Sequence, residues 1–568
     1  MKKIFTSIAF LTSVITLSAT VLSPEEALQR ASVSGAMKMK GTASPRLLTT
    51  YRSADNTPTL YAFSTGSDEG FSILSADDCA APVLGYSESG RWDTDNLPPQ
   101  IEWWMGEYSR QIEYARANPQ RFKPLRAPAK AQETRADTYG DPIAPMVTAM
   151  WDQTYPFNNE CPYDGNSRSV TGCVATAMAQ VMYYWKYPEA GIGEITYLNG
   201  SGNQEELSID LSAKRFDWAN MIDNYRFSST LLQRDAVAYL MKACGYSVRM
   251  NYSAGSSGTK SELVPAALRT NFSYDKDAQL LARGSSFTEK SWNTKIYEEL
   301  KYVGPVIYSG TADLSSRMGH CFVCDGYDKD GYFHINWGWS GVCNGYFLLS
   351  ALNPDTLGTG GGEVSGYNYD QDITLGITPP VGRINISNLA IGNAADDSGN
   401  VSGKGYIYRI NDPYNIEVSM LVSVTGGAVS TPIDIAIYET DPSTMKNVGL
   451  VLEEMLPEKI TAPDGTRETF SHSFAFREFD PGKLYTMNVY YTLKGQRQFI
   501  NSLRFAASSG VDEIAGESLY EAYDLGGRLV ATSYGTNPSE ALKALPKGIY
   551  IIRATDASGR VSTTKAIL

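Results

Sequence analysis

The chain has 568 residues, too many for one hydrophobic core, and at about 150 residues per domain it predicts three or four domains. Its composition, 42% hydrophobic and 20% charged with 36 Tyr and 50 Gly, is typical of a folded, strand-rich protein and excludes a wholly disordered chain. With 49 basic and 62 acidic residues the net charge is -13, which argues against nucleic acid as a partner.

Residues 1–19 have the pattern of a secretory signal peptide. A Lys pair is followed by an apolar stretch from Ile4 to Leu17 and then by small residues at Ser18 and Ala19. We therefore expect a secreted or cell-surface protein. No later segment approaches the roughly 20 apolar residues of a membrane helix, so no transmembrane segment is expected. Export permits disulfides, but the seven Cys are odd in number, so at least one must be free or pair with another chain.

Residues 20–137 predict a small α+β unit. Ser23 is followed by Pro and, three positions on, by Glu26, which is the signature of a capped helix start. Two strand-like runs, 59–66 and 70–77, come next.

A helix is then predicted over 101–118, with Trp104 and Tyr108 on one face. The segment 121–137 alternates Pro, Ala and basic residues without periodicity. Such a composition is typical of an exposed linker that proteases cleave easily, so we expect a domain boundary there.

The remaining chain predicts three further regions. Residues 138–380 mix helix and strand patterns and are rich in Trp and Tyr. Residues 381–508 consist of short alternating runs separated by turn residues, which predicts an Ig-like β-sandwich. Residues 509–568 predict a second, compact β module.

Cys173 is the candidate nucleophile. It follows Gly172 and opens an apolar helical pattern that extends to Trp185. A helix N-terminus lowers the pKa of a thiol, and a nearby imidazolium lowers it further. The alternative is that Cys173 is simply a small buried residue.

Histidine is scarce, so a catalytic base must be His320, His334 or His472. His472 lies in the predicted sandwich, far along the chain from the thiol, and is expected at the surface. The other two flank a predicted hairpin. His320 starts the first strand, where side chains can line a cleft, whereas a structural role is expected for His334 in the middle of the second.

A catalytic imidazole needs a group that orients it, and an oxyanion needs a donor besides the backbone. Asn336 and Trp339 both lie on the second strand, and the hairpin register decides which of them reaches His320. Asn336 is the favoured orienter. Gln153, a neutral amide on a loop rich in Pro and Asn, is the candidate oxyanion donor, although such a residue alone is usually just a polar loop residue.

These motifs resemble the streptopain family (C10) of secreted papain-like cysteine peptidases, and especially interpain-like members from anaerobic Bacteroidetes. The matching stretches include "WDQTYPFN", "TGCVATAMAQVMYYWKYP", "GHCFVCDGYD" and "FHINWGWSGVCNGYFLLSALNPDTLGTGGG". The resemblance implies that Cys173 is the nucleophile and His320 the general base and then acid. It also implies Gln153 in the oxyanion hole, with Asn336 and Trp337 supporting the imidazole.

The resemblance further implies a substrate cleft bordered by Ser256, Ser257, Gly319 and Trp337, beside a glycine loop at 358–362. No cofactor and no metal are expected, because three His cannot form a zinc set with any nearby Cys.

The Cys-rich catalytic region departs from streptopain itself. Cys321 and Cys324 have CxxC spacing, but on a strand they point to opposite faces, so buried thiols are expected rather than a metal or redox pair.

The implied fold class is α+β: a papain-like catalytic domain (138–380), an N-terminal α+β prodomain (20–137) and C-terminal β-sandwich modules. The prodomain would inhibit its own enzyme until the linker is cleaved. Residues 509–568 resemble sorting modules of the type IX secretion pathway, which would make the secretion machinery a partner. Protein substrates, from a host or the diet, and a role in virulence are expected.

Two other functions fit parts of the sequence. The same Cys-His pair could serve a cell-wall amidase or transpeptidase. Alternatively, the chain could be an inert surface adhesin whose sandwich binds protein or glycan, although such a protein has no chemical reason to keep Cys173, His320, Gln153 and Asn336 together.

Overall fold

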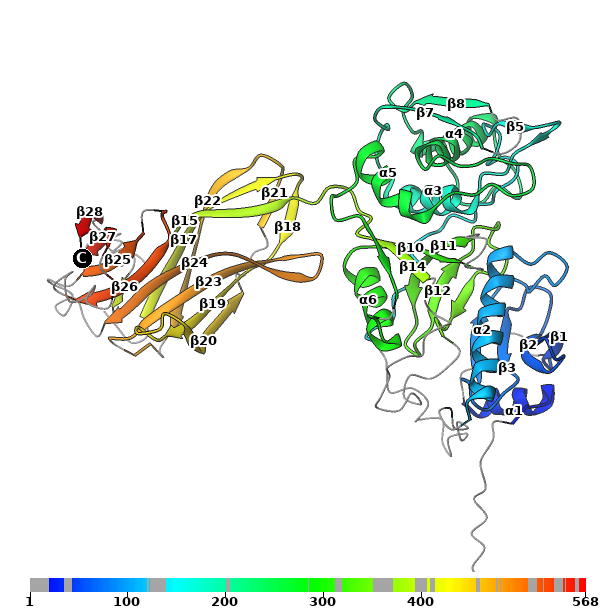
Figure 1. Cartoon of the computed structure of the whole chain (residues 1–568), viewed down its shortest axis with the longest axis horizontal. Helices are drawn as coiled ribbons and strands as arrows, with labels where there is room; N and C mark the ends of the chain where they lie inside the picture. Colours follow the sequence, from blue (N-terminus) through cyan, green and yellow to red (C-terminus); the bar gives the residue numbers. More distant parts are fainter. Residues whose placement is uncertain are drawn as a thin grey trace, which may run out of the picture. The chain divides into compact units, whose positions relative to one another are not determined.

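The computed structural model contains two compact units, Met1–Pro379 and Pro380–Leu568 (Figure 1). The predicted signal peptide, the linker at 121–137 except residue 122, and the glycine loop at 358–362 lie outside the described residues. The structure describes residues 20–34, 43–119, 122, 139–200, 205–284, 286–311, 319–350, 371–393, 406–408, 414–455, 460–476, 479–480, 482–508, 518–524, 526–535, 545–546, 548–556 and 561–567.

A ten-stranded sheet runs through the described part of the first unit in the order β1-β2-β3-β4-β13-β12-β11-β10-β14-β9. Its strands are β1 (Arg46–Arg52), β2 (Pro58–Ser64), β3 (Phe71–Ser75), β4 (Val83–Ser87), β9 (Gln279–Ala282), β10 (Val306–Thr311), β11 (Gly319–Tyr327), β12 (Phe333–Asn336), β13 (Gly345–Phe347) and β14 (Gln371–Leu375). Strand β4 pairs with β13 in antiparallel orientation, and Tyr86 faces Tyr346. The predicted prodomain and the predicted catalytic domain therefore contribute to one sheet.

The helices of this unit are α1 (Pro24–Ser34), α2 (Pro99–Ala117), α3 (Cys173–Trp185), α4 (Leu231–Ser247), α5 (Val264–Asn271) and α6 (Glu289–Tyr302), with short 3-10 turns η1 (Trp218–Asn220) and η2 (Ser261–Leu263). Two small hairpins are formed by β5 (Tyr163–Asp164) with β6 (Ser167–Arg168) and by β7 (Glu194–Leu198) with β8 (Glu206–Asp210). The predicted start of the first helix is confirmed. The Ser23 N–H donates to the Glu26 carboxylate at 2.7 Å, and the Glu26 N–H donates to Ser23 Oγ at 3.2 Å.

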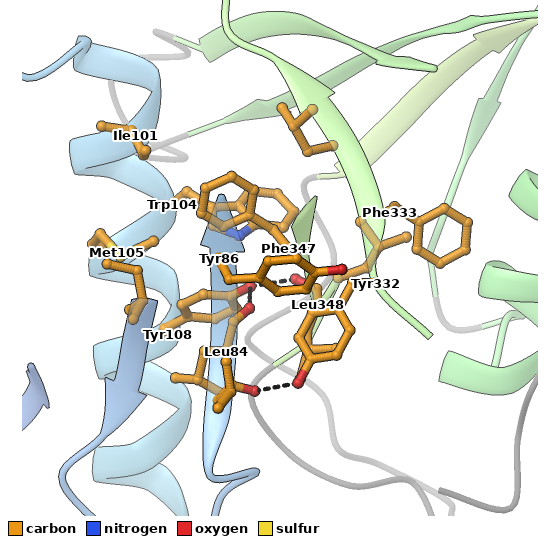
Figure 2. Close-up of a cluster of buried hydrophobic side chains, with 14 of the residues drawn as sticks. Leu84, Tyr86, Ile101, Trp104, Met105, Tyr108, Tyr332, Phe333, Phe347 and Leu348 are labelled. Atoms are coloured by element: carbon orange, nitrogen blue, oxygen red, sulfur yellow. Dashed lines mark hydrogen bonds between the residues drawn. The ribbon is translucent and has the colours of Figure 1, made fainter. Parts of the chain in front are cut away.

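Helix α2 packs against one face of the sheet through an aromatic cluster (Figure 2). The Trp104 ring centroid lies 5.7 Å from that of Phe322 and 6.1 Å from that of Trp337. The Tyr108 hydroxyl donates to the backbone carbonyl of Leu348, just after β13. Trp104 and Tyr108 share one helix face, as predicted. Because burying a large apolar side chain stabilises by about 1.5–3 kcal/mol, this cluster binds the N-terminal segment firmly to the later strands.

The opposite face of the same strands packs against α3, α4 and α5. Along β11 the side chains alternate, as strand geometry requires. Cys321 and Val323 belong to the α3 cluster, whereas Phe322 and Cys324 belong to the α2 cluster. The prediction that Cys321 and Cys324 are buried thiols on opposite faces is confirmed. All seven Cys of the chain are free.

The second unit is built from antiparallel strands with one parallel pair, β16 with β24. The sheet orders are β15-β17-β22, β16-β24-β23-β19-β20, β18-β21 and β26-β25-β27-β28. Their bounds are β15 (Arg383–Asn393), β16 (Tyr406–Tyr408), β17 (Tyr414–Thr425), β18 (Val429–Thr431), β19 (Ile433–Thr440), β20 (Asn447–Met455), β21 (Ile460–Ala462), β22 (Arg467–Phe476), β23 (Leu484–Leu493), β24 (Gln496–Ser508), β25 (Ser518–Tyr523), β26 (Leu529–Gly535), β27 (Ile549–Asp556) and β28 (Val561–Ile567). One core cluster fills the space between the first two sheets, consistent with the predicted sandwich. Among the helices that the structure describes, none is long and apolar enough to span a membrane.

We expect Trp104→Ala to lower the free energy of unfolding of the first unit by about 3–5 kcal/mol, because it leaves a cavity in the aromatic cluster. Denaturant unfolding of the full chain, followed by Trp fluorescence, measures the change. The control is Tyr163→Ala, whose side chain is 54% exposed and which should change the free energy by less than about 0.5 kcal/mol. Equal effects of both variants would contradict the role of this cluster.

Candidate active site

Cys173 is the first residue of α3, as predicted. Gly172 before it has a φ of 85°, in the left-handed region that favours glycine. A Cβ on Gly172 would also lie 2.7 Å from Met250 Cε and 3.0 Å from the Ser257 carbonyl oxygen. Glycine is thus required both for the backbone turn and for the close approach of the 250–258 loop to the N-terminus of α3.

The Cys173 thiol is half-buried and meets three backbone N–H groups. Burial is the largest influence and raises the pKa of the Cys173 thiol above its usual 9.0. The N–H groups of Cys321, Val174 and Cys173 itself act in the opposite direction. The positive end of the α3 dipole also favours a thiolate. In this conformation burial prevails, so Cys173 is a neutral thiol at neutral pH.

His320 lies at the start of β11, beneath helix α2. Its ring centroid is 6.1 Å from the Trp103 ring centroid, and the two planes meet at 43°. Gly310 is directly opposite His320 on β10, and a Cβ there would overlap with the Trp103 ring. Trp103 therefore covers the Gly310–His320 pair, and burial lowers the pKa of His320 below its usual 6.5.

The candidate nucleophile and the candidate base lie against different faces of β11. His320 contacts α2 through Trp103, whereas Cys173 packs against the α3 cluster and receives the N–H of Cys321. Between these described residues there is no hydrogen bond from the Cys173 thiol to the His320 ring. The candidate nucleophile and the candidate base are therefore not bonded to each other in this conformation.

Gln153 is connected by its backbone to the segment that leads into α3. Its carbonyl accepts the N–H of Thr171 at 3.0 Å, two residues before Cys173, and its side chain is only 7% exposed. Asp152 next to it accepts from Ser340 Oγ at 2.8 Å. The structure therefore brings Gln153 to the Cys173 end of α3, where an oxyanion donor is needed.

Asn336 ends β12 opposite Val323 of β11. Its Nδ2 donates to the Ala149 carbonyl at 2.8 Å, and its Oδ1 accepts from Gln180 Nε2 and from the Gly338 N–H, each at 3.1 Å. These three bonds fix the amide orientation. None of the described bonds of Asn336 goes to His320, so its assignment as the orienter stays a prediction.

The predicted substrate-binding residues fall into two groups. Ser257 is buried beside Gly172 and its hydroxyl accepts from the Ser253 N–H at 3.0 Å, while Ser256 is exposed on the same loop. Gly319 begins β11 next to His320. Of this group, Ser257 lies next to the N-terminus of α3, and Gly319 lies next to His320.

Trp337 forms the second group and is fully buried. Its Nε1 donates to the Cys343 carbonyl at 3.0 Å, and its ring packs on Trp104, Phe322 and Phe347. In this conformation a substrate cannot reach Trp337. Trp104 of α2 covers it together with Phe322 and Phe347.

His334 and His472 are the two histidines outside the predicted catalytic set. His334 Nδ1 lies 2.6 Å from the fully buried Asp325, whose second oxygen accepts from the Val147 N–H at 2.7 Å. His334 lines a hollow of about 620 Å³ that contains none of the four predicted catalytic residues. The structural role expected for His334 is confirmed. His472 was expected at the surface, but it is half-buried in β22 of the second unit and its Nε2 is buried, because the ring packs beside Phe474.

Sequence reasoning did not identify Trp103 or Gln180. Trp103 precedes Trp104 in "IEWW", but helical periodicity alone does not say that it would reach His320. Gln180 is a fully buried polar residue in an otherwise apolar helix. That anomaly was the available signal, because a buried amide needs partners, here Ala149 and Asn336.

Two family models match the chain. The Peptidase C10 family matches residues 151–347, and the Spi protease inhibitor family matches residues 19–112. Streptopain of Streptococcus pyogenes serotype M1 is 34% identical over 342 residues, which cover 56% of this chain and 80% of streptopain. The thiol protease/hemagglutinin PrtT of Porphyromonas gingivalis is 36% identical over 351 residues. That match covers 60% of this chain but only 39% of PrtT.

Two solved structures are similar to part of this chain. A fragment of prointerpain A from Prevotella intermedia is 33% identical and matches with a TM-score of 0.49, covering 59% of this chain and 99% of the fragment. Active interpain A from the same organism is 35% identical and matches with a TM-score of 0.38, covering 43% and 98%.

We expect Trp103→Ala to raise the pKa of His320 toward 6.5, because the ring that buries the imidazole is removed. Because folding lowers the pKa of His320, the unfolded state, in which the ring is exposed, binds the proton more tightly than the folded state. The stability that the buried, neutral His320 contributes to the packing of α2 is therefore fully present above pH 6.5. It is lost as the pH falls below that value.

NMR titration of the three histidines in a Cys173→Ala background measures this pKa. The control is Trp218→Ala, which removes a Trp whose Nε1 donates to the Pro188 carbonyl, and it should leave the His320 titration unchanged. Identical His320 titration curves in the two variants would show that Trp103 does not bury the imidazole.

Proposed function

Because the chain belongs to the Peptidase C10, or streptopain, family of cysteine peptidases, we propose that it is a secreted cysteine endopeptidase made as a zymogen. It hydrolyses proteins by acyl transfer through Cys173 and His320. The observation that carries the proposal is the position of Cys173 at the N-terminus of α3, with three backbone N–H groups on its sulfur and Gln153 bonded to the same turn.

In the active form the Cys173 thiolate attacks a peptide carbonyl carbon. The resulting oxyanion accepts from the Cys173 N–H and from the Gln153 side chain. The His320 imidazolium protonates the leaving amine, and the same ring then deprotonates the water that hydrolyses the thioester. Asn336, whose amide is fixed by Ala149 and Gln180, orients the imidazole.

Latency follows from the contacts of the N-terminal segment. Trp103 covers His320, Trp104 buries Trp337, and β4 occupies the edge of β13. For His320 to meet Cys173 its ring must leave Trp103, so α2 must move or depart. Cleavage in the linker at 121–137 would release it, and the match of residues 19–112 to a protease inhibitor family supports this inhibitory role.

We also propose that the protein has five parts, namely a signal peptide, a prodomain, a catalytic domain, a β-sandwich and a C-terminal sorting module, and that it is exported. A signal peptide at 1–19 would direct export, and the module at 509–568 would engage a secretion machinery and be removed or anchored at the cell surface. Support for this comes from the sequence patterns. Host or dietary proteins are the proposed substrates.

We expect Cys173→Ala to abolish casein degradation and self-cleavage in the linker, with a rate loss of at least about a thousandfold, because the nucleophile is removed. Gel electrophoresis and peptide release in reductant measure both. The control is Cys244→Ala, which removes a buried free thiol in α4 and should keep full activity. Equal degradation by wild type and Cys173→Ala would contradict the proposal, and release of ammonia or muropeptides without peptides would favour an amidase.

We expect Gln153→Ala to lower kcat roughly 10²- to 10³-fold with little change in KM, because the lost donor acts on the oxyanion of the transition state. Steady-state kinetics of the processed enzyme measure the two constants. The control is Gln233→Ala, which removes the capping box of α4 but no predicted catalytic group. A changed KM at wild-type kcat would place Gln153 in substrate binding instead.

A further inference from the structure

A row of side chains crosses the sheet from the candidate nucleophile to a carboxylate. On β11 and β10, Cys321 is directly opposite Ser309, and on β10 and β14, Ser309 is directly opposite Asp372. Residues opposite each other on neighbouring strands share one face of a sheet. The Ser309 hydroxyl confirms the shared face, since it lies 3.7 Å from Cys321 Sγ. The N–H of Cys321 in turn points to the sulfur of Cys173.

The row lies on the α3 side of the sheet, where Cys173 is. Strands are about 4.8 Å apart, so Asp372 is about 10 Å from Cys321 across two strand spacings. An extended peptide advances at most about 3.6 Å per residue. The carboxylate is therefore within reach of a long side chain on one of the three substrate residues nearest the scissile bond.

Asp372 is a carboxylate with unused binding capacity. Its Oδ2 accepts from Ser261 Oγ at 3.1 Å, and Ser309 also bonds to it. Its Oδ1 is buried and, among the described residues, has no hydrogen-bond partner. Within the same residues no Lys, Arg or His forms an ion pair with Asp372. A partly buried carboxylate without a cation carries a desolvation cost, and a bound cation would remove that cost.

The buried cation next to this row is Arg283, just after β9, and it bonds to a side chain on the opposite face of the sheet. Arg283 is 2% exposed, and its guanidinium donates to Gln371 Oε1 at 2.8 Å. The same oxygen accepts from the Tyr308 hydroxyl, which belongs to the α2 cluster. Gln371 and Tyr308 each precede a member of the row by one residue, so they point away from Asp372. On the row's own side, Glu262 adds a second negative charge that raises the pKa of Asp372, as burial does.

We propose that Asp372 is a specificity determinant that binds a basic side chain, arginine or lysine, of the substrate close to the scissile bond. The inference rests on the proposed function, because it needs Cys173 to be the nucleophile. Arginine fits the site well: its forked N–H groups can donate to the unpartnered Oδ1 while Ser261 holds Oδ2.

The test uses the full chain after processing, and paired fluorogenic peptides. Each pair differs only by arginine against citrulline, which has nearly the same shape and no charge, at one of the three positions before the scissile bond. We expect wild type to favour arginine at one position by roughly tenfold or more in kcat/KM. Asp372→Asn should reduce the ratio at that position to near one while it keeps cleaving the citrulline peptide.

The control is Asp434→Asn in the second unit, since Asp434 is also a partly exposed carboxylate with one buried oxygen that has no described partner. It should leave the arginine preference unchanged. A wild-type ratio near one at all three positions, or the same ratio in wild type and Asp372→Asn, would overturn the inference while leaving the peptidase proposal intact. Failure to cleave either peptide, or cleavage that survives Cys173→Ala, would instead overturn the proposed function.

A second measurement needs no variant. Because burial raises the pKa of Asp372 above its usual 3.8, the carboxylate is neutralised as the pH falls through that raised value. The wild-type ratio of kcat/KM for the arginine peptide to kcat/KM for the citrulline peptide should therefore decline on acidification. The kcat/KM of the citrulline peptide is the internal reference, because it reports the titration of every other group. A ratio that is independent of pH across the acid range, with the enzyme still folded by circular dichroism, would overturn the inference even if Asp372→Asn does not fold.

Discussion

The alternation of side chains along β11 is the constraint on which the rest of the site depends. Two adjacent residues of one strand must point to opposite faces. His320 meets Trp103 of α2 on one face, while the Cys321 side chain belongs to the α3 cluster, against which Cys173 packs, on the other. A base and a nucleophile placed in this way cannot react together. In the proposed mechanism the first residues of β11 must reorient before the two side chains can meet, and the neighbours of His320 hold its ring where it is.

Those neighbours belong to the N-terminal segment, which is part of the sheet. Its strand β4 continues the ladder at β13, and its helix α2 supplies the tryptophans that cover His320 and Trp337. An inhibitor that merely plugged a cleft could leave without disturbing the fold. Here its departure would expose a sheet edge and an aromatic face, so the free-energy cost of releasing the segment is high.

Local patterns predicted much of this structure, and long-range pairings account for what they missed. The helix starting at Cys173, the hairpin of His320 and the opposed burial of Cys321 and Cys324 all follow from periodicity over short stretches. The residue opposite Asn336 could not be predicted in this way, because a bulge between Cys324 and Gly326 sets the hairpin register. Sequence does not reveal a bulge. The contact of Trp103 with His320 and the row ending at Asp372 join segments far apart in the chain, and no local pattern encodes them.

The two halves of the candidate dyad differ in how they are held. The contacts described above for the nucleophile and the oxyanion donor come from the catalytic region: Gly172 at the turn, and Thr171 on Gln153. None of these requires residues 20–119. The burial that lowers the pKa of His320 is different, because Trp103 contributes to it. Removing the N-terminal segment therefore changes the base while leaving the oxyanion side in place. Because preorganised dipoles need no rearrangement when charge develops, the proposed mechanism places the change from latent to active form at His320 and not at the oxyanion donors.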